Sequence, residues 1–374
     1  PGFVMRLRHS IDDGIHLNGA GREDILLLQR EKDGKRIAFL ANRSEHALEI
    51  SARFTEKSRL TLISPETGVE TPLPSKIIDK KAEAMLHFAP YQSWLLVIEK
   101  GELVQETETE LKPREIELQD VSVDVGENVA VIYDFHYIDG NEQIDVRNEP
   151  RFAPVYWDLA PPDFKRFAGT YETKLQIEDK PEFIRLVVDR DYSDCQVTVN
   201  GTEIFFVPTQ RWLTDPSDLA ADVTHLLKQG ENVVRVVSPT KLSEPIRFAG
   251  DFDVAQTDDG IVIKVKTDRY PFHLEEPMPY YSGTVVYTAD FDLDNKPARV
   301  ELNLGDVWDA AAVIVNGEPA GKRLWTPYVF DITDYITSGS NRLRIETRSN
   351  LANILLGRHR PFGLRRNPVV RVWE

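Results

Sequence analysis

The chain has 374 residues, of which 41% are hydrophobic and 28% charged, a composition typical of globular proteins and a length sufficient for two to four domains. Its formal net charge is -16, which disfavours nucleic acids and anionic polysaccharides as ligands and favours a neutral one. No apolar stretch approaches the roughly 18 residues of a membrane span, and the single cysteine, Cys195, excludes an intrachain disulfide. Because the first residues contain neither an initiator methionine nor a signal peptide, we expect a fragment or processed product of a bacterial protein, either cytoplasmic or secreted.

Residues 1–100 contain short apolar segments bounded by turn residues, which is the pattern of β-strands. The first two segments are joined through Asp33 and Gly34, a pair that strongly favours a hairpin turn. No alternation of strands and helices is visible. Residues 1–100 are therefore predicted to form one antiparallel β-sandwich. The expected strands are residues 25–29, 36–41, 48–54, 60–63 and 94–99.

A polar, acidic segment follows at residues 101–117, and runs of charge of this kind are usually solvated connectors. The next domain is expected to span residues 118–260 and to begin with strands at residues 121–125 and 129–135. Residues 261–374 form the last predicted domain.

An internal repeat supports these two domains. Val197–Gly201 (VTVNG) returns as Val313–Gly317 (VIVNG), and Asp222–Thr224 (DVT) returns as Asp331–Thr333 (DIT). In each copy a β-branched strand ends at Asn-Gly, which favours a two-residue turn. The Asp-x-Thr motif then predicts a single short helical turn. Strands joined by long loops in this order predict two jelly-roll sandwiches, so the whole chain is expected to be all-β.

The second copy and the first domain contain motifs that point to a known family. The motifs of the second copy are Tyr281–Tyr287, Leu302–Val307, Ala311–Gly317, Trp325–Tyr328, Phe330–Thr333 and Pro361–Leu364, and those of the first domain are Phe39–Ser44, Ile63–Gly68 and Leu86–Ser93. The motifs of the second copy resemble the galactose-binding-like, sugar-binding jelly roll of glycoside hydrolase family 2, and more closely the C-terminal region of the α-L-rhamnosidases of family 106. Those of the first domain resemble the accessory sandwich that follows the catalytic barrel in such enzymes.

The resemblance implies that the catalytic barrel of the same polypeptide is the partner of this region. A glycosidase needs two carboxylates beside the scissile bond, and in the resembled families both are on the barrel. We therefore assign no catalytic residue to this chain, whose 61 acidic residues make chance pairs easy to find.

Aromatic side chains are the usual platforms for sugars, because a pyranose face packs against a ring. The candidate carbohydrate contacts lie in the second copy, where a long loop from Gly317 to Trp325 is expected to bring aromatic and polar groups together. Trp325 could equally anchor this loop to the sandwich edge, and the sequence leaves both interpretations open. Trp212, Tyr280 and Tyr281 are further aromatic candidates. The candidate site residues are Trp308, Trp325, Tyr328, Asp306 and Arg323.

No metal site can be assigned from the sequence. Residues 189–194 have the alternating oxygens of a calcium loop, but the sixth position is not Gly and the twelfth is Asn200, so an EF-hand is excluded. The resemblance implies a possible structural calcium without locating it. No other cofactor is expected.

Three functions remain open at this stage. The first is a non-catalytic C-terminal region of an α-L-rhamnosidase-like glycoside hydrolase, which braces the barrel and contacts a neutral oligosaccharide or polysaccharide. The second is an autonomous carbohydrate-binding protein, and the third is a structural or adhesion protein of stacked sandwiches. The first is favoured because both the N-terminal sandwich and the final jelly roll resemble parts that follow a barrel.

Overall fold

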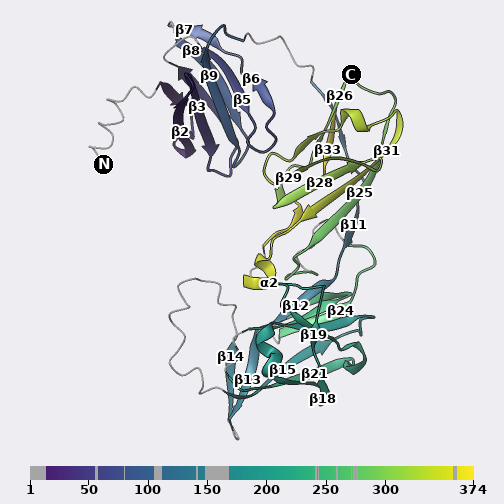
Figure 1. Ribbon diagram of the computed structural model, residues 1–374. Coiled ribbons are helices and arrows are strands. Elements are labelled where there is room, and N and C mark those ends of the chain that lie inside the picture. Colours follow the sequence, from purple (N-terminus) through teal and green to yellow (C-terminus); the bar gives the residue numbers. More distant parts are fainter. Residues whose placement is uncertain are drawn as a thin grey trace, which may run out of the picture.

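The computed structural model describes residues 14–54, 58–79, 81–104, 112–139, 142–147, 168–240, 242, 244–257, 260–270, 272, 274, 277–356 and 360–374. Within these residues the regular secondary structure is almost entirely β-strand, arranged in three sandwiches (Figure 1), and the predicted all-β class is confirmed. The described helices are short, and none of them has the length and apolar character needed to cross a membrane. They are η1 (Arg22–Asp24), η4 (Arg190–Asp194), η5 (Thr224–Leu226), η6 (Thr333–Tyr335) and α2 (Ala352–Leu356).

The N-terminal sandwich packs a four-stranded sheet against a five-stranded sheet, and Asp33 and Gly34 form the predicted hairpin turn with positive φ. Alternate residues of the central strands point inward, as the face-to-face packing of two sheets requires. The four-stranded sheet has the order β1-β4-β8-β7: β1 (Ile15–Asn18), β4 (Leu48–Phe54), β8 (Lys81–Phe88) and β7 (Lys76–Ile78). The five-stranded sheet has the order β2-β3-β9-β5-β6: β2 (Ile25–Lys32), β3 (Lys35–Asn42), β9 (Ser93–Lys100), β5 (Ser58–Ile63) and β6 (Glu70–Pro72).

The middle jelly roll contains the first copy of the repeat. One of its sheets has the order β12-β22-β16-β20-β19: β12 (Asn128–Ile132), β22 (Ile246–Gly250), β16 (Ile184–Val188), β20 (Leu219–Asp222) and β19 (Val207–Pro208). The other has the order β14-β13-β15-β21-β17-β18, with β23 and β24 attached beside β15: β14 (Glu142–Arg147), β13 (Asp134–Asp139), β15 (Gly169–Ile177), β21 (Gly230–Ser238), β17 (Gln196–Val199), β18 (Thr202–Ile204), β23 (Phe252–Thr257) and β24 (Gly260–Val265).

The C-terminal jelly roll contains the second copy, and its two sheets repeat the strand order of the middle one. The first has the order β10-β33-β26-β30: β10 (Arg114–Glu117), β33 (Val369–Trp373), β26 (Arg299–Asn303) and β30 (Val329–Asp331). The second has the order β11-β25-β31-β28-β29: β11 (Ser122–Val125), β25 (Thr284–Leu293), β31 (Gly339–Arg348), β28 (Ala310–Val315) and β29 (Glu318–Arg323). The two jelly rolls have the same strand order in both sheets, so the internal repeat is confirmed as one topology used twice. In the first sheet β12-β22-β16-β20 corresponds to β10-β33-β26-β30, and in the second β13-β15-β21-β17-β18 corresponds to β11-β25-β31-β28-β29.

The middle jelly roll is inserted into the C-terminal one. Strands β10 and β11 precede the middle jelly roll in sequence but pair with β33 and β25 of the C-terminal sheets. The strand pairing therefore does not follow the domain boundary predicted between residues 117 and 118. The predicted connector, residues 101–117, contains β10, and the predicted first jelly roll, residues 118–260, starts with β11; both strands belong to the C-terminal jelly roll. The acidic pattern concealed β10: its carboxylates point to solvent, where Glu115 accepts from Arg371 at 2.9 Å, while the intervening Ile116 packs against the core.

Two further expectations about single elements are corrected. Residues 129–135, expected to be one strand, are divided between β12 and β13 in different sheets, with Tyr133 between them. The stretch from Gly317 to Trp325, expected to be a long loop, is mainly strand β29, which pairs with β28 through a β-bulge. A bulge adds twist and an unpaired residue. The regular alternation of apolar and polar residues that would have predicted a strand is therefore lost in β29.

The Asn-Gly turn of each copy is tied to the rest of its sandwich by a second, buried asparagine. In the C-terminal jelly roll, Asn316 at the turn donates to Asn341 Oδ1 at 2.9 Å and to the Tyr335 carbonyl at 3.0 Å. Asn341 is fully buried and donates to the carbonyls of Thr337 and Gly339. Asn200 and Asn232 make the matching contacts in the middle jelly roll.

The Asp-x-Thr motif starts the predicted helical turn in both copies. The Asp331 carboxylate accepts from the Thr333 amide at 3.0 Å, and the Thr333 hydroxyl accepts from the Val300 amide at 2.9 Å on β26. Asp222 and Thr224 make the same pair of contacts, the second to Ile184 on β16. The motif thus fixes the 3-10 turn to the neighbouring sheet in addition to starting it.

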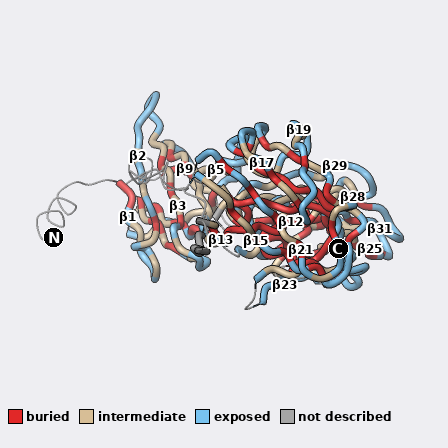
Figure 2. Tube along the Cα trace, turned by 90° about the horizontal axis from the view of Figure 1, so that it is seen from below, coloured by how far each residue is buried: buried red, intermediate tan, exposed pale blue. Residues whose placement is uncertain are grey.

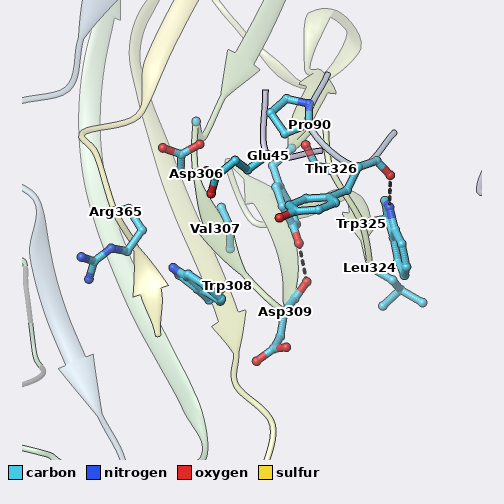
Figure 3. Close-up of a pocket in the computed structure, with 13 residues that line it drawn as sticks. Glu45, Pro90, Asp306, Val307, Trp308, Asp309, Leu324, Trp325, Thr326 and Arg365 are labelled. Carbon is cyan, nitrogen blue, oxygen red and sulfur yellow. Dashed lines mark hydrogen bonds between the residues drawn. The ribbon is translucent and has the colours of Figure 1, made fainter. Parts of the chain in front are cut away.

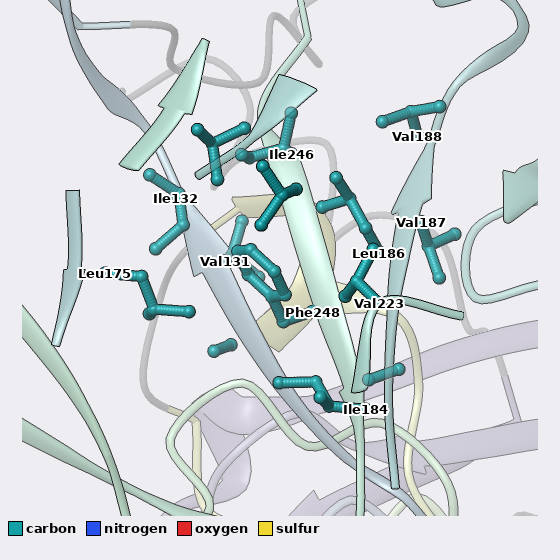
Figure 4. Packing of buried hydrophobic residues seen from close by; sticks show 14 of the residues in the cluster. Val131, Ile132, Leu175, Ile184, Leu186, Val187, Val188, Val223, Ile246 and Phe248 are labelled. Atoms are coloured by element: carbon teal, nitrogen blue, oxygen red, sulfur yellow. The ribbon is translucent and has the colours of Figure 1, made fainter. Parts of the chain in front are cut away.

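Among the described residues, the middle jelly roll has the largest hydrophobic core. Its strands β12, β16 and β22 are buried along their full length on both faces, and Figure 2 shows β12 within the buried part of the chain. Figure 4 shows the aliphatic side chains of these strands around Phe248, with Leu175 and Val223 contributed by neighbouring elements. Such a core provides the dominant favourable contribution to folding.

We predict that Gly317→Val destabilises the C-terminal jelly roll by about 1–2 kcal/mol, because Gly317 has φ 88° and a β-branched residue is strained in the left-handed region. Apart from its two chain neighbours, no atom of the described residues lies within 4 Å of a Cβ added at Gly317, so the cost is conformational and not steric. Denaturant unfolding measures the change. Gly317→Asn is the matched control and should cost much less, since Asn tolerates positive φ; equal losses for Val and Asn would contradict this explanation.

Candidate functional site

A cleft of about 600 Å³ lies between the N-terminal sandwich and the C-terminal jelly roll. Figure 3 shows Trp308 and Trp325 on its walls, Asp306 and Arg365 at one end, and Glu45 and Pro90 contributed by the N-terminal sandwich. The cleft therefore combines residues from two domains. Its lining residues are Glu45, Pro90, Tyr91, Gly305, Asp306, Val307, Trp308, Asp309, Leu324, Trp325, Thr326, Tyr328 and Arg365.

Trp308 is positioned by a small ribbon at the sandwich edge. It lies on β27 (Val307–Trp308), which pairs with β32 (Gly363–Leu364), and it faces Gly363 in the register. Its side chain is 45% exposed, so a large part of the indole remains available to a ligand. The following residue, Asp309, has φ 69°, and its carboxylate accepts from the amide and side chain of Asn350. These contacts stabilise the turn that presents the indole.

Trp325 crosses to the other domain. Its indole N–H donates to the Tyr91 carbonyl of the N-terminal sandwich at 2.7 Å, while 57% of the side chain stays exposed. The two interpretations of this residue are therefore compatible, since the indole N–H anchors the residue and the ring still lines the cleft.

Tyr328 is a supporting residue of the cleft floor. It is buried, and its hydroxyl donates to the Asp309 carbonyl. Burial raises the pKa of Tyr328 to about 12, so the hydroxyl remains a neutral donor throughout the physiological range. Tyr328 thereby connects the loop that carries Trp325 to the turn that carries Trp308.

The two polar candidates occupy different positions. Asp306 lines the cleft and forms an ion pair with Arg366 at 3.1 Å. Arg323 is not among the lining residues; its guanidinium lies over the Phe330 ring at 5.3 Å and is 3.9 Å from the Glu66 carboxylate. Arg323 therefore belongs to the interface between domains.

Sequence reasoning missed the N-terminal half of the cleft. Glu45, Pro90 and Tyr91 lie on two loops of the N-terminal sandwich, and Pro90 and Tyr91 fall inside the Leu86–Ser93 motif used for the family resemblance. The motif was a usable signal, but nothing in the sequence shows that its loop faces a domain more than 200 residues further along. Of the other aromatic candidates, Trp212 is 48% exposed but does not line the cleft, and Tyr281 is buried and donates to the Thr284 carbonyl at 2.7 Å.

The charge of the cleft favours a neutral ligand. Three carboxylates, those of Glu45, Asp306 and Asp309, and one guanidinium, that of Arg365, line it. An anionic sugar would meet a net negative surface. Aromatic faces beside hydrogen-bonding groups are the combination that binds the hydroxyls and axial hydrogens of a neutral sugar.

A second polar group lies in the middle jelly roll. The carboxylates of Asp189, Asp215 and Asp218 can bring one oxygen each within 4.8 Å of one another, and such oxygens are the donors that calcium prefers. Asp218 is fully buried and accepts from the amides of Leu213 and Thr214 at 2.6 and 2.9 Å, so it also shapes its own loop. Burial raises the pKa of the Asp189 carboxyl, whereas the Ser217 hydroxyl lowers that of Asp215.

Comparisons with known proteins relate the chain to glycoside hydrolases. No protein-family model matches it. A curated protein of Formosa agariphila named "Putative beta-glucuronidase" is 28% identical over 181 residues, which are 46% of this chain and 14% of that protein. A solved rhamnosidase from Novosphingobium sp. PP1Y aligns with 99% of this chain and 26% of its own, at 16% identity and a TM-score of 0.49. A Streptomyces avermitilis α-L-rhamnosidase complexed with L-rhamnose aligns with 95% of this chain and 38% of its own, at 13% identity and a TM-score of 0.30. The chain thus spans well under half the length of these proteins.

We predict that Asp189→Asn raises the unfolding temperature of the middle jelly roll at pH 7 in the presence of a chelator. Because the folded-state pKa of Asp189 is raised, its ionised form is disfavoured in the folded state. The penalty is absent below the unfolded pKa of about 4 and is fully present above the folded pKa. The difference in melting temperature between variant and parent should therefore be close to zero at the acidic end and grow as pH rises through that window.

Asp189→Asn keeps the side-chain oxygen that accepts from the Asp191 amide at 3.1 Å, so the start of η4 is preserved. Asp191→Asn, which removes an exposed charge nearby, is the control and should show a much smaller pH-dependent difference. A variant that melts lower than the parent at pH 7 with chelator would contradict the assignment of the raised pKa to burial.

Proposed function

We propose that this chain is a non-catalytic C-terminal region of a glycoside hydrolase resembling the family 106 α-L-rhamnosidases, and that it braces the catalytic barrel and binds neutral carbohydrate in the cleft between its first and last domains. The cleft carries the carbohydrate part of the proposal, since it offers two exposed indoles beside hydrogen-bonding side chains. The curated relative named as a beta-glucuronidase supports the enzyme class, and its much greater length supports an accessory role for this region.

The bracing role is supported by an asymmetry between the outer faces of the N-terminal sandwich. On the five-stranded sheet, cross-strand pairing places Leu28, Phe39, Leu95 and Ile63 in one row across β2, β3, β9 and β5. None of these four side chains belongs to a core cluster of the described residues, and alternation points them away from the core. A contiguous apolar row on an outer face is typical of a protein interface.

The opposite outer face is polar, as an outer face exposed to water should be. Its cross-strand pairs on β4 and β8 are Glu49 with His87, Ser51 with Met85, and Arg53 with Glu83. Arg53 and Glu83 form an ion pair at 2.9 Å. The contrast favours the five-stranded sheet as the face against which another domain of the longer polypeptide packs.

The structural calcium implied by the family resemblance is proposed for the cluster of Asp189, Asp215 and Asp218. Their oxygens fit a hard cation in kind. Calcium should then raise the melting temperature of the parent more than that of Asp189→Asn. An equal rise in the melting temperature of both proteins would contradict this calcium site.

We predict that the chain binds neutral rhamnose- or galactose-containing oligosaccharides with a dissociation constant of about 1 mM, corresponding to about 4 kcal/mol. Trp308→Ala should weaken binding by up to about tenfold, since one aromatic contact contributes about 0.5–1.5 kcal/mol. Tryptophan fluorescence or calorimetric titration measures the affinity. Trp212→Ala is the matched control, because that indole is similarly exposed but lies outside the cleft. The chain should release no nitrophenol from nitrophenyl glycosides, including the α-L-rhamnoside.

Equal affinities of Trp308→Ala and the parent would show that the indole does not contact sugar. Turnover of a nitrophenyl glycoside that is lost on substitution of one carboxylate of this chain would overturn the non-catalytic assignment.

We predict that Leu28→Glu changes the stability of the isolated chain by no more than about 0.5 kcal/mol, because the side chain is 56% exposed. In the longer polypeptide that includes the barrel, the same substitution should cost about 2 kcal/mol or more, since it buries an unpaired charge. Thermal unfolding of both proteins measures the difference. Met85→Glu, on the polar outer face, should have little effect in either protein, and a Leu28→Glu variant without effect in the longer polypeptide would reject this face as the bracing surface.

A further inference from the structure

The N-terminal sandwich and the C-terminal jelly roll meet through a small set of directed contacts beside the cleft. The Trp325 indole N–H donates to the Tyr91 carbonyl at 2.7 Å, and the Leu324 amide donates to the Glu66 carboxylate at 2.6 Å. The second oxygen of Glu66 lies 3.9 Å from the Arg323 guanidinium. Arg323, the last residue of β29, and the two residues that follow it thus contact two loops of the other domain.

The loop that carries Tyr91 is built to hold one geometry. Tyr91 has φ 56°, an uncommon conformation for a residue of its size, and its amide donates to the Ser44 carbonyl at 3.1 Å. Asn42, which is 2% exposed, donates to the Ala89 carbonyl at 3.0 Å, and the Gln92 side chain accepts from the Ala89 amide at 2.7 Å. These bonds fix the Tyr91 carbonyl towards Trp325 and leave half of the Tyr91 side chain exposed.

The loop that carries Glu66 is a tight turn. The Gly68 amide donates to the Ser64 carbonyl at 2.8 Å, and the Ser64 amide donates to the Val69 carbonyl at 3.0 Å. Gly68 has φ 72°, which suits glycine. The turn therefore places Glu66 at its tip, opposite the Leu324 amide.

We propose that the cleft is a two-domain binding site whose ligand couples to the docking of the domains: Tyr91 and Glu45 contact the same neutral oligosaccharide as Trp308, while the Trp325–Tyr91 and Leu324–Glu66 hydrogen bonds hold the docked state. This inference rests on the proposed carbohydrate binding and extends it to a second domain. Tyr91 has two separable roles, since its backbone carbonyl anchors Trp325 and its side chain lines the cleft.

The coupling follows from the location of the lining residues. A ligand that contacts residues of both domains binds the docked state more tightly than the separated state, because only docking brings Tyr91 and Trp308 to one cleft. By reciprocity, the docked state binds the ligand more tightly than the undocked state by the same factor by which the bound ligand strengthens docking, so loss of docking weakens ligand binding. The neutral oligosaccharide therefore acts as a connector between the N-terminal sandwich and the C-terminal jelly roll.

The docking is tested on the full chain without ligand, by pulsed electron paramagnetic resonance between two spin labels. The labels are attached at Met85→Cys and Asp334→Cys, both exposed positions on the two domains, in a Cys195→Ser background. We expect a narrow distance distribution in this parent. Trp325→Phe with Glu66→Ala should broaden it, with the docking constant falling by about two- to tenfold for the Trp325 bond and by about tenfold or more for the bond to the Glu66 carboxylate. Trp212→Phe is the matched control and should leave the distribution narrow.

The ligand contact is tested by titrating neutral rhamnose-terminated and galactose-terminated oligosaccharides separately into the same proteins. Tyr91→Asn keeps the carbonyl acceptor and tolerates positive φ, so it should stay docked yet bind the responding oligosaccharide several-fold more weakly. The Trp325→Phe/Glu66→Ala variant should also bind more weakly, and saturating sugar should narrow its distance distribution again.

Each outcome separates the two ideas. A double variant with the parent's narrow distribution would overturn the docking contacts, and a sugar bound equally by parent, Tyr91→Asn and the double variant would overturn the two-domain site while leaving the proposed function intact. Absence of binding by any protein, with docking still sensitive to the double substitution, would reject the proposed carbohydrate function and with it the ligand coupling. Weaker binding by both variants, with docking lost only in the double variant, supports the inference.

Discussion

The pairing of β10 with β33 and of β11 with β25 is the constraint on which the rest of the molecule depends. The C-terminal jelly roll is complete only when the strands of residues 114–125 pair with β25 and β33, which follow the middle jelly roll in sequence. The two ends of the middle jelly roll therefore have to lie close together. That place is closely bonded. The buried Asn128 side chain donates to the carbonyls of Phe252 and Pro277, and the Gly126 amide donates to the Tyr281 hydroxyl at 3.2 Å. The two jelly rolls are thereby joined by two chain connections, which limits their independent movement.

Much of this architecture was predictable, and the part that was not has one physical cause. The Asn-Gly turns and the Asp-x-Thr turns follow from local backbone chemistry, and the repeat between residues 169–237 and 283–347 follows from self-similarity. The first two strands of each jelly roll carry no repeated motif. Their assignment depends on partners far away in sequence, such as Val370 for Ile116, and no local pattern encodes such a choice. No local feature of the sequence therefore indicated that the domain boundary does not lie between residues 117 and 118.

The candidate site shows the same division. Trp308 and Trp325 were found because exposed aromatic residues near turns are recognisable in a sequence, and both line the cleft. Glu45 and Tyr91 were missed because half of the cleft belongs to another domain. Arg323 was misplaced because β29 was taken for a loop, which put its guanidinium among the hydroxyl-binding groups when it lies over Phe330. The structure shows that the Trp325 indole N–H is an anchor, and because an indole also has an apolar face, this anchor is compatible with the proposed contact of the ring with sugar.

The size of the docking interactions decides whether a weak ligand can influence them. A neutral hydrogen bond such as that of Trp325 contributes about 0.5–1.5 kcal/mol, and one to a carboxylate such as Glu66 about 1.5–3 kcal/mol. Their contribution is therefore a few kcal/mol, and a ligand with a dissociation constant of about 1 mM stabilises the docked state by up to about 1.4 kcal/mol at ten times that concentration. A large apolar interface would stabilise docking by more free energy than such a ligand could offset. A set of hydrogen bonds without a charged partner would stabilise docking too weakly to hold the two domains together. Contacts from Leu324 and Trp325 to two fixed loops lie between these limits, where occupancy of the cleft and docking of the N-terminal sandwich can respond to each other.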